Sequence, residues 1–213
     1  MVEAFNDGLA RVTADWQFLV KLDGDLSFEP DYFEACLEEF RKDPALGIGG
    51  GVVLCREGGK LVVDSPGDPP FHVRGAVKMY RRACWEQVAP LVAAPGWDTI
   101  DEVKANRLGW RTRTFEGIHV VQHRPTGRAD GAWRNWFKNG RANYVTGYHP
   151  LFMLAKCALR AVRSPLLVAG LALSAGYVTG FFSSQGRLQD EETVGYLRRQ
   201  QLRRLFLRPS IYG

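Results

Sequence analysis

The stretch WQFLVKLDGD, residues 16–25, constrains the fold of this 213-residue chain more than any other. An apolar run rich in strand-forming residues ends abruptly in two acids, Asp23 and Asp25, which predicts a buried strand that carries them to the edge of a sheet. Open α/β sheets bind their ligands beyond the carboxyl ends of their strands. We therefore expect an α/β fold with a binding site at these two carboxylates.

The spacing of the two acids indicates what this site would hold. Carboxylates one residue apart, with Gly24 between them, can turn toward one point. Hard oxygen ligands at this spacing suit Mg²⁺ or Mn²⁺ carrying a phosphate. The alternative is a solvated turn in which Asp and Gly merely end a strand. The apolar run before the acids favours a divalent metal with a diphosphate.

Helix and strand patterns alternate around this central strand. The expected helices are 2–13, 32–40, 81–88 and one after Gly96, and the expected strands are 47–54, 73–80, 111–115 and 118–122. We expect the last two strands to form a closing hairpin. The glycines Gly49 to Gly51 indicate close backbone packing, because no helix begins directly after them as a phosphate loop requires.

Several ordered motifs resemble family 2 glycosyltransferases of the nucleotide-sugar-binding GT-A type. They are Val20 to Asp25, Pro30 to Phe33, Gly96 to Asp101 and Gln122 to Arg124. The resemblance covers residues 1–127 and implies a partial GT-A-like (Rossmann-like) mixed sheet flanked by helices. It also implies that the nucleoside-binding half with which the family fold normally opens is lacking from these residues.

The resemblance implies an inverting sugar transfer from a nucleotide-diphosphate donor. Asp23, Asp25 and His123 would hold the divalent metal, and an acid near residue 100 would be the general base. Matching on Gly-Trp-Asp-Thr selects Asp101 as the base, whereas counting back from the later Gly-Trp pair selects Asp98. The choice between the two stays open, and we prefer Asp101 because a helix N-cap is a complete alternative role for Asp98.

Basic side chains near residue 78 are candidates for contacts with the donor diphosphate. Arg74 and Lys78 lie on a predicted strand, and Arg81 and Arg82 follow it. Cationic side chains, arginine forks above all, bind phosphate oxygens well, although at least two of the four are expected to be merely solvated. Residues 57–73 predict a hairpin and a surface loop, which is either a border of an acceptor site or a simple connection.

The last third of the chain, residues 128–213, predicts an all-helical, membrane-associated region. The segment 165–182 holds eighteen residues without a charge, near the lower limit of about 17–25 residues for a membrane-spanning helix. Spanning and interfacial attachment both stay open. Gly176 and Gly180 would let another helix approach closely, which allows a homo-oligomer. This apolar segment disfavours nucleic acid as a partner for the neighbouring basic and aromatic residues.

The four cysteines are widely spaced and form no Cys-x-x-Cys pair. Each lies in an apolar or helical setting, so we expect buried free thiols, in keeping with a reducing compartment.

Taken together, these patterns predict metal-dependent sugar transfer to a lipid-linked, membrane-bound or polysaccharide acceptor at the cytoplasmic face of the cell membrane. The alternative is a non-catalytic, membrane-bound scaffold that no longer binds a donor.

Overall fold

The computed structural model describes residues 2–124, 131–163, 166–183 and 186–213. These residues form two compact units. The α/β unit runs to Ala93 and resumes at Asp101, and the helical unit consists of Ala94–Ile100 with the residues after the α/β unit. The predicted domain boundary after Gly127 lies outside the described residues.

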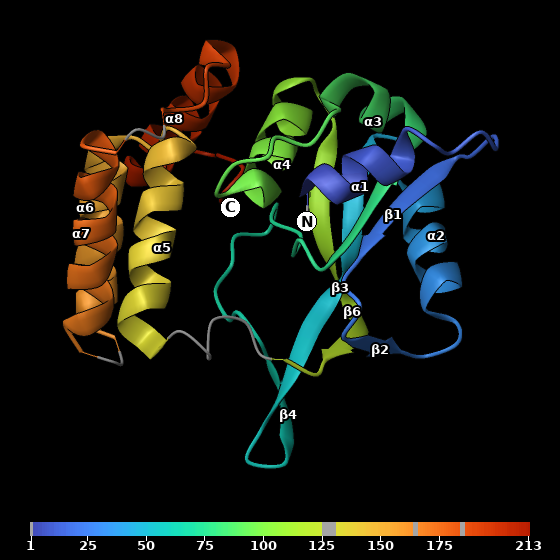
Figure 1. Cartoon of the computed structure of the whole chain (residues 1–213), viewed down its shortest axis with the longest axis horizontal. Helices are drawn as coiled ribbons and strands as arrows, with labels where there is room; N and C mark the ends of the chain where they lie inside the picture. The colour runs from blue at the N-terminus through green and yellow to red at the C-terminus, as the bar shows by residue number, and fades with distance from the viewer. Residues whose placement is uncertain (1, 125–130, 164–165, 184–185) are drawn as a thin grey trace. The chain divides into compact units, whose positions relative to one another are not determined.

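The α/β unit contains a six-stranded mixed sheet in the order β1-β5-β3-β6-β2, with β4 paired to β3 (Figure 1). The strands are β1 (Phe18–Leu22), β2 (Leu26–Phe28), β3 (Leu46–Glu57), β4 (Lys60–Val63), β5 (Val77–Arg81) and β6 (Arg111–Gln122). The β3–β6 pair is parallel and the other pairs are antiparallel. This arrangement confirms the mixed α/β sheet that the sequence predicts.

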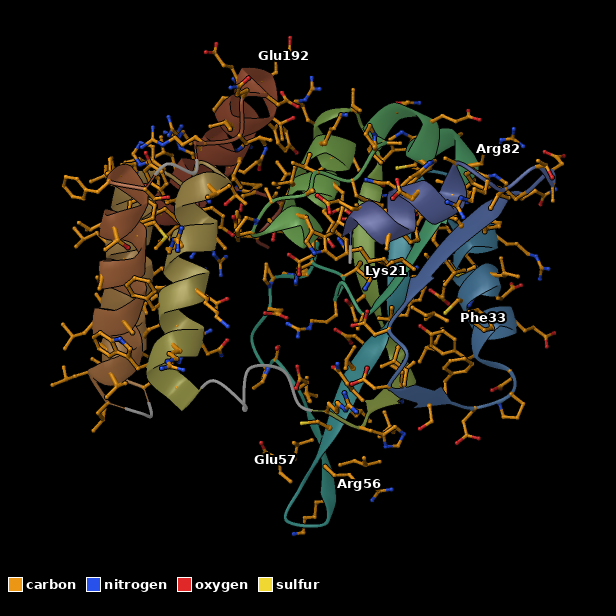
Figure 2. All side chains as sticks on the ribbon, in the orientation of Figure 1. Lys21, Phe33, Arg56, Glu57, Arg82 and Glu192 are labelled. Atoms are coloured by element: carbon orange, nitrogen blue, oxygen red, sulfur yellow. The ribbon has the colours of Figure 1, made fainter. Side chains whose placement is uncertain are left out.

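Helices cover both faces of this sheet. They are α1 (Val2–Leu9), α2 (Tyr32–Lys42), α3 (Arg82–Val88) and α4 (Trp97–Arg107), of which the part from Asp101 belongs to the α/β unit. Figure 2 shows Phe33 on α2, Lys21 among the strands, and Arg56 and Glu57 toward the tip of the β3–β4 hairpin.

Strand alternation divides the side chains of β5 between the two faces of the sheet. Val77 and Met79 join Phe40 of α2 in the apolar core. The side chains between them point the other way, because successive residues of a strand face opposite sides. Lys78 and Tyr80 are therefore delivered to the face on which α4 lies, where both contact Asp101.

The glycines of β3 pack closely against neighbouring segments, as predicted. A Cβ added at Gly50 would lie 2.4 Å from the Val77 carbonyl oxygen, and one at Gly49 would lie 2.3 Å from the ring of Phe115. Neither position leaves room for a side chain. The glycine run therefore lets β3 sit at the centre of the sheet between β5 and β6.

The predicted closing hairpin is wrong. Residues 111–122 form one strand, β6, which pairs with β3 along its length. The register shifts so that Gly51 faces Phe115 and Val52 faces His119, and the extra residues around Gly117 form a bulge. The residues that look like a turn therefore form a bulge within one strand, because β6 pairs with β3 both before and after them.

Two element boundaries also differ from the expected ones. Helix α1 ends at Leu9 instead of residue 13, and Val12 beyond it is half exposed and packs too little to extend the helix. Strand β5 begins at Val77 instead of Val73, because the Val73 backbone N–H donates to the carboxylate of Glu102 and not to a neighbouring strand.

The helical unit contains α5 (Gly131–Val145), α6 (Pro150–Ala161), α7 (Val168–Phe181) and α8 (Glu191–Leu205). Helix α7 packs on both α5 and α6. A Cβ at Gly176 of α7 would lie 2.0 Å from the Phe137 carbonyl oxygen of α5, and one at Gly140 of α5 would lie 2.2 Å from the Leu173 carbonyl oxygen. The predicted close helix approach is confirmed, and α5 of the same chain provides it.

These contacts also show that helices of the same region cover part of the apolar segment that the sequence assigns to a membrane. Small residues on α5 and α6 allow both helices to bury one side of α7, which local patterning could not reveal. Across the described residues, no helix has the length and the apolarity needed to cross a membrane.

Candidate functional site

Backbone hydrogen bonds join three segments at the carboxyl end of β1. The Asp23 backbone N–H donates to the Ala76 carbonyl oxygen over 3.0 Å, and the His123 backbone N–H donates to the Asp25 carbonyl oxygen over 2.9 Å. The two acids, the segment before β5 and the end of β6 therefore meet at one edge of the sheet.

The side chains at this edge do not form a complete metal site. The Lys21 ammonium pairs with the Asp23 carboxylate, and His123 Nε2 lies 2.7 Å from the hydroxyl oxygen of Ser27. In the part of the chain that the structure describes, no three His, Cys, Asp or Glu side chains gather as a metal cluster. Asp23 and Asp25 still offer carboxylate oxygens at the sheet edge, which fits an ion held jointly with substrate phosphates, as Mg²⁺ commonly is.

A buried cluster of charged side chains, centred on Lys78, lies on the face of the sheet toward which Lys21 also points. The Lys78 Nζ lies 2.7 Å from Asp101 Oδ1 and 2.9 Å from Glu102 Oε1, and none of the three side chains is more than 3% exposed. Lys21 of β1 is directly opposite Lys78 of β5, so both lysines face the same side. The ammonium groups of Lys21 and Lys78 and the carboxylates of Asp23, Asp101 and Glu102 thus lie near one another, on β1 or directly after it, on β5 and on α4.

Asp101 accepts hydrogen bonds on both carboxylate oxygens. Lys78 donates to both oxygens, the Tyr80 hydroxyl donates to Oδ2 over 2.6 Å, and the Glu102 backbone N–H donates to Oδ1 over 2.8 Å. Burial raises the pKa of Asp101 to about 6, against the opposing attraction of the Lys78 ammonium. This pKa suits a general base near neutral pH. However, Lys78, Tyr80 and the Glu102 backbone surround the Asp101 carboxylate.

Glu102 and His72 belong to this cluster although sequence reasoning assigned them no role. His72 Nδ1 lies 2.9 Å from Glu102 Oε2, and the Val73 backbone N–H donates to Glu102 Oε1 over 2.7 Å. Glu102 is fully buried. A signal was present, because two adjacent acids on the apolar side of a helix need buried partners.

The other predicted site residues have the following surroundings. Asp98 is half-buried in the first turn of α4, which begins at Trp97, so Asp98 lies inside the helix and is not its N-cap. The Arg74 guanidinium pairs with Asp64 over 3.0 Å and with Asp68 over 3.8 Å. Lys78 is the cluster cation described above.

Arg81, the last residue of β5, and Arg82, the first of α3, both make structural contacts. Arg81 donates to the carbonyl oxygens of Leu46 and Phe40, which ties α2 and β3 to β5. Arg82 pairs with Asp15 and with Glu86 on the protein surface. Both arginines therefore have structural partners that the sequence did not indicate.

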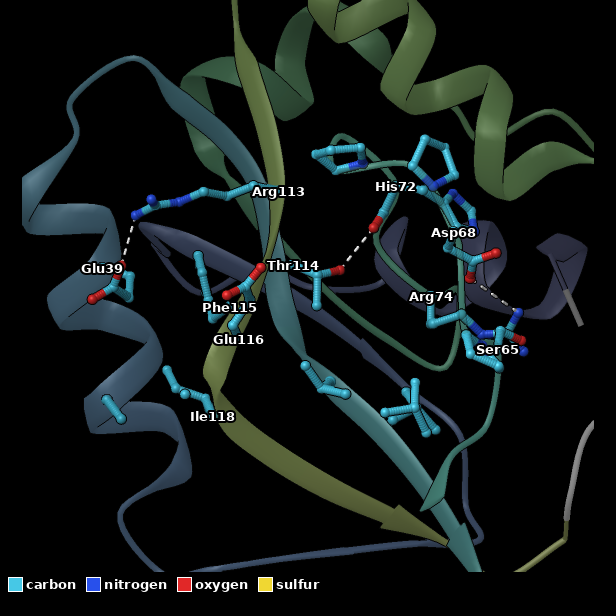
Figure 3. A pocket seen from close by; sticks show the side chains of 18 of the residues that line it. Glu39, Ser65, Asp68, His72, Arg74, Arg113, Thr114, Phe115, Glu116 and Ile118 are labelled. Atoms are coloured by element: carbon cyan, nitrogen blue, oxygen red, sulfur yellow. Dashed lines mark hydrogen bonds and ion pairs between the residues drawn. The ribbon is translucent and has the colours of Figure 1, made fainter. Parts of the chain in front are cut away.

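A cavity of about 840 Å³ lies in the α/β unit between α2 and the loop before β5. Figure 3 shows Arg113 reaching Glu39 on one side of it, and His72, Asp68 and Arg74 on the other. The Thr114 hydroxyl donates to the His72 carbonyl oxygen over 2.7 Å and joins β6 to this loop. The wall combines charged and hydroxyl side chains with apolar ones such as Val53 and Ile118.

A mixed sheet with helices on both faces and paired acids at the end of its edge strand defines a GT-A-like α/β domain. Residues 1–83 match the family described as Glycosyl transferase family 2. Over these residues the chain is similar to the family 2 glycosyltransferases.

One similar solved structure is the mannosyltransferase PcManGT from Pyrobaculum calidifontis, in complex with GDP-Man and Mn²⁺. The match has a TM-score of 0.57 and 15% sequence identity, and it covers 86% of this chain and 67% of that chain. At this identity the similarity establishes the fold. No curated protein matches the chain significantly.

Proposed function

We propose that this chain transfers a sugar from a nucleotide-diphosphate donor to an acceptor hydroxyl with inversion at the anomeric carbon. The observation that carries the proposal is the family match over residues 1–83, because that segment includes Asp23 and Asp25 at the carboxyl end of β1. The similar mannosyltransferase is in complex with GDP-Man and Mn²⁺, which supports a nucleotide-sugar donor and a divalent ion here.

Asp23 and Asp25 are the groups that would hold the ion, together with phosphate oxygens of the donor. The ion would neutralise the charge that develops on the leaving diphosphate. The Lys21 ammonium beside Asp23 adds a fixed positive charge at the same edge. Arg74, on the segment that leads to Ala76, is our proposed phosphate contact, and His123 is our proposed further ligand on the neighbouring strand.

We propose Asp98 as the general base instead of Asp101, because Asp98 is the more exposed of the two aspartates of α4. Asp101 contacts Lys78 and Tyr80 through its carboxylate oxygens and is 4% exposed, so a substrate hydroxyl has no access to it. Asp98 lies three residues earlier on the same helix and therefore on the same side. It would take the proton of the acceptor hydroxyl as that oxygen attacks the anomeric carbon opposite the leaving diphosphate.

The cavity beside Arg74 is our proposed acceptor site. Its wall places charged and hydroxyl side chains beside apolar ones, a mixture that suits the polar and apolar faces of a sugar. Arg74 lies two residues before Ala76, whose carbonyl oxygen accepts from the Asp23 backbone N–H. A short stretch of backbone thus links the cavity to the acids of β1. The acceptor class that we propose is a lipid-linked or polysaccharide glycan at the cytoplasmic side of a membrane.

Calorimetric titration of GDP and UDP into the full chain, with and without Mn²⁺, tests the proposal. We expect binding that depends on Mn²⁺ and weakens at least about tenfold in Asp25→Ala, since a carboxylate ligand is lost. Asp31→Ala is the matched control, because Asp31 is exposed and its side chain caps no helix N–H. Nucleotide binding that Asp25→Ala leaves intact would refute the metal assignment.

A second candidate function is a scaffold that binds no donor. The pairing of Lys78 with Asp101 and Glu102 favours it, because these contacts engage two predicted site residues with each other. Absence of binding at millimolar GDP and UDP would support the scaffold over the enzyme. Where binding is present, loss of transfer in Asp98→Asn with donor affinity unchanged would support Asp98 as the base.

A further inference from the structure

Helices α6 and α7 each expose a regular row of apolar side chains. On α6 and its end the row is Leu151, Leu154, Ala158 and Val162, and on α7 and its ends it is Leu167, Leu171, Val178 and Phe182. Members follow one another at intervals of three, four or seven, so each row runs along one side of its helix. We call these two rows the α6–α7 face.

Both rows point away from α5. Val178 is two residues from Gly176 and from Gly180, the residues of α7 that lie against Phe137 and Tyr144 of α5. Two residues correspond to about 200° of rotation on a helix, so Val178 is on the opposite side. On α6, the Arg160 guanidinium lies over the Trp136 ring of α5, and Ala158 and Val162 are again two residues away.

The two helices also contact each other, so the rows are neighbours on one surface. A Cβ at Gly170 of α7 would lie 2.7 Å from the Cys157 carbonyl oxygen of α6. Figure 1 shows α5, α6 and α7 side by side. The exposed fractions reach 69% at Leu154 and 87% at Phe182. Contiguous apolar surface of this kind usually marks an interaction site, whereas single exposed leucines do not.

The net charge of the region that contains this face indicates its partner. From Gly131 to Gln189 the sequence has no Asp or Glu but seven Arg and Lys. Residues 126–213 as a whole contain thirteen basic and four acidic residues, while the whole chain has a net charge of only +5. An apolar face within a basic region fits an anionic lipid surface, which attracts basic residues and accepts apolar side chains.

A second copy of the chain fits this surface less well. Face-to-face pairing would bring two strongly basic regions together without an acid between residues 131 and 189 to compensate. Like charges across an interface oppose association. An anionic bilayer offers the complementary sign.

We propose that the α6–α7 face binds the surface of an anionic lipid bilayer, with both rows of apolar side chains inserted among the lipids. Arg163 is exposed and follows Val162, the last member of the α6 row, so it is positioned to meet lipid phosphates. The inference goes beyond the proposed sugar transfer, because lipid binding requires neither donor nor acceptor.

Flotation of the full chain with vesicles tests the inference. The chain should float with vesicles of phosphatidylcholine and phosphatidylglycerol and bind about tenfold less to phosphatidylcholine alone. The face variant carries Leu154→Gln, Leu171→Gln and Val178→Gln, and it should lose about tenfold in affinity for the anionic vesicles. All three side chains are exposed, so the variant should retain its helical circular dichroism.

The matched control carries Leu61→Gln, Leu108→Gln and Val63→Gln, which change the same residue types at exposed positions of the α/β unit. It should float like the unmodified chain. Failure of the unmodified chain to float, equal binding by the face variant, or binding independent of lipid charge would each overturn the inference. So would a dimer that the face variant converts to a monomer without any vesicle binding, because the face would then join two copies.

Discussion

Two lysines on adjacent strands dominate the candidate site at the scale of single residues. Lys21 and Lys78 are opposite each other, are nearly or fully buried, and face three carboxylates. Removing one partner of such a group would leave a buried charge uncompensated, which is far more costly than losing a surface pair. The cluster therefore fixes how α4 and the segment before β5 meet the sheet.

The Asp101 carboxyl should make the stability of the protein depend on pH. Its pKa is about 6 in the folded chain, against an ordinary value of 3.8 for an aspartate, so the folded state binds more protons than the unfolded state between these values. The contribution of the Asp101 carboxyl to the free energy of unfolding is therefore fully present below pH 3.8 and is lost as the pH rises through about 6. Asp101→Asn removes this dependence.

Urea unfolding of both proteins at several pH values from 4 to 7 measures the difference. The stability advantage of the unmodified chain over Asp101→Asn should shrink by about 2 kcal/mol across this range. Two curves that run parallel from acid to neutral pH would contradict the assigned pKa.

At the scale of elements, glycines determine how α7 is buried. Gly176 and Gly140 bring the backbones of α7 and α5 into direct contact, and Gly170 does the same against α6. A glycine normally weakens a helix because it has more conformational freedom to lose on folding. Here the close approach it permits outweighs that cost.

Paired glycine substitutions should change stability in opposite directions. Gly176→Ala should lower the free energy of unfolding by about 1–3 kcal/mol, because its Cβ would meet the Phe137 carbonyl oxygen and force the helices apart. Gly195→Ala on α8 has nothing within 4 Å and should raise it by about 0.5–1 kcal/mol. Thermal unfolding followed by circular dichroism measures both, and equal effects would argue against the α5–α7 contact.

At the scale of the whole molecule, charge and burial are distributed unequally along the chain. The acidic residues lie mostly in the first 125 residues, whereas the later residues are strongly basic. Each unit also buries its own cysteines, Cys157 in the helical unit and Cys36, Cys55 and Cys84 in the α/β unit. The predicted buried free thiols are therefore confirmed, and their reactivity would show whether each unit is folded.

The thiols should be unreactive while both units are folded. Burial raises the pKa of Cys84 to about 12, with a smaller contribution from the Asp101 carboxylate, and burial raises the pKa of Cys36 to about 11. Only the thiolate reacts rapidly with disulfide reagents. Ellman's reagent at pH 8 should modify all four thiols in guanidinium chloride and none of them quickly in buffer. Rapid modification of even one thiol in buffer would indicate that the unit containing it opens.

Much of this organisation was predictable from local patterns. The apolar run before Asp23 and Asp25 predicted the strand and the sheet edge at which the acids lie, because strand formation and chain direction are encoded within a few residues. The helical spacing in residues 32–40 predicted α2 for the same reason, and the glycines of β3 predicted close packing.

Other features depended on partners distant in the sequence. Lys78 and Asp101 are 23 residues apart and belong to a strand and a helix, so no local pattern could predict that two candidate site residues pair with each other. Residues 111–122 look like a hairpin locally, yet β3 draws them into one strand.

The sequence by itself determined the fold class, the position of the paired acids and the two regions of opposite charge, since each follows from neighbouring residues or simple counting. Only the tertiary structure decided which charges are neutralised inside the α/β unit and which side of α7 is buried. Ion pairs and helix contacts form between surfaces that folding brings together, so their energies depend on distances that the order of residues does not contain.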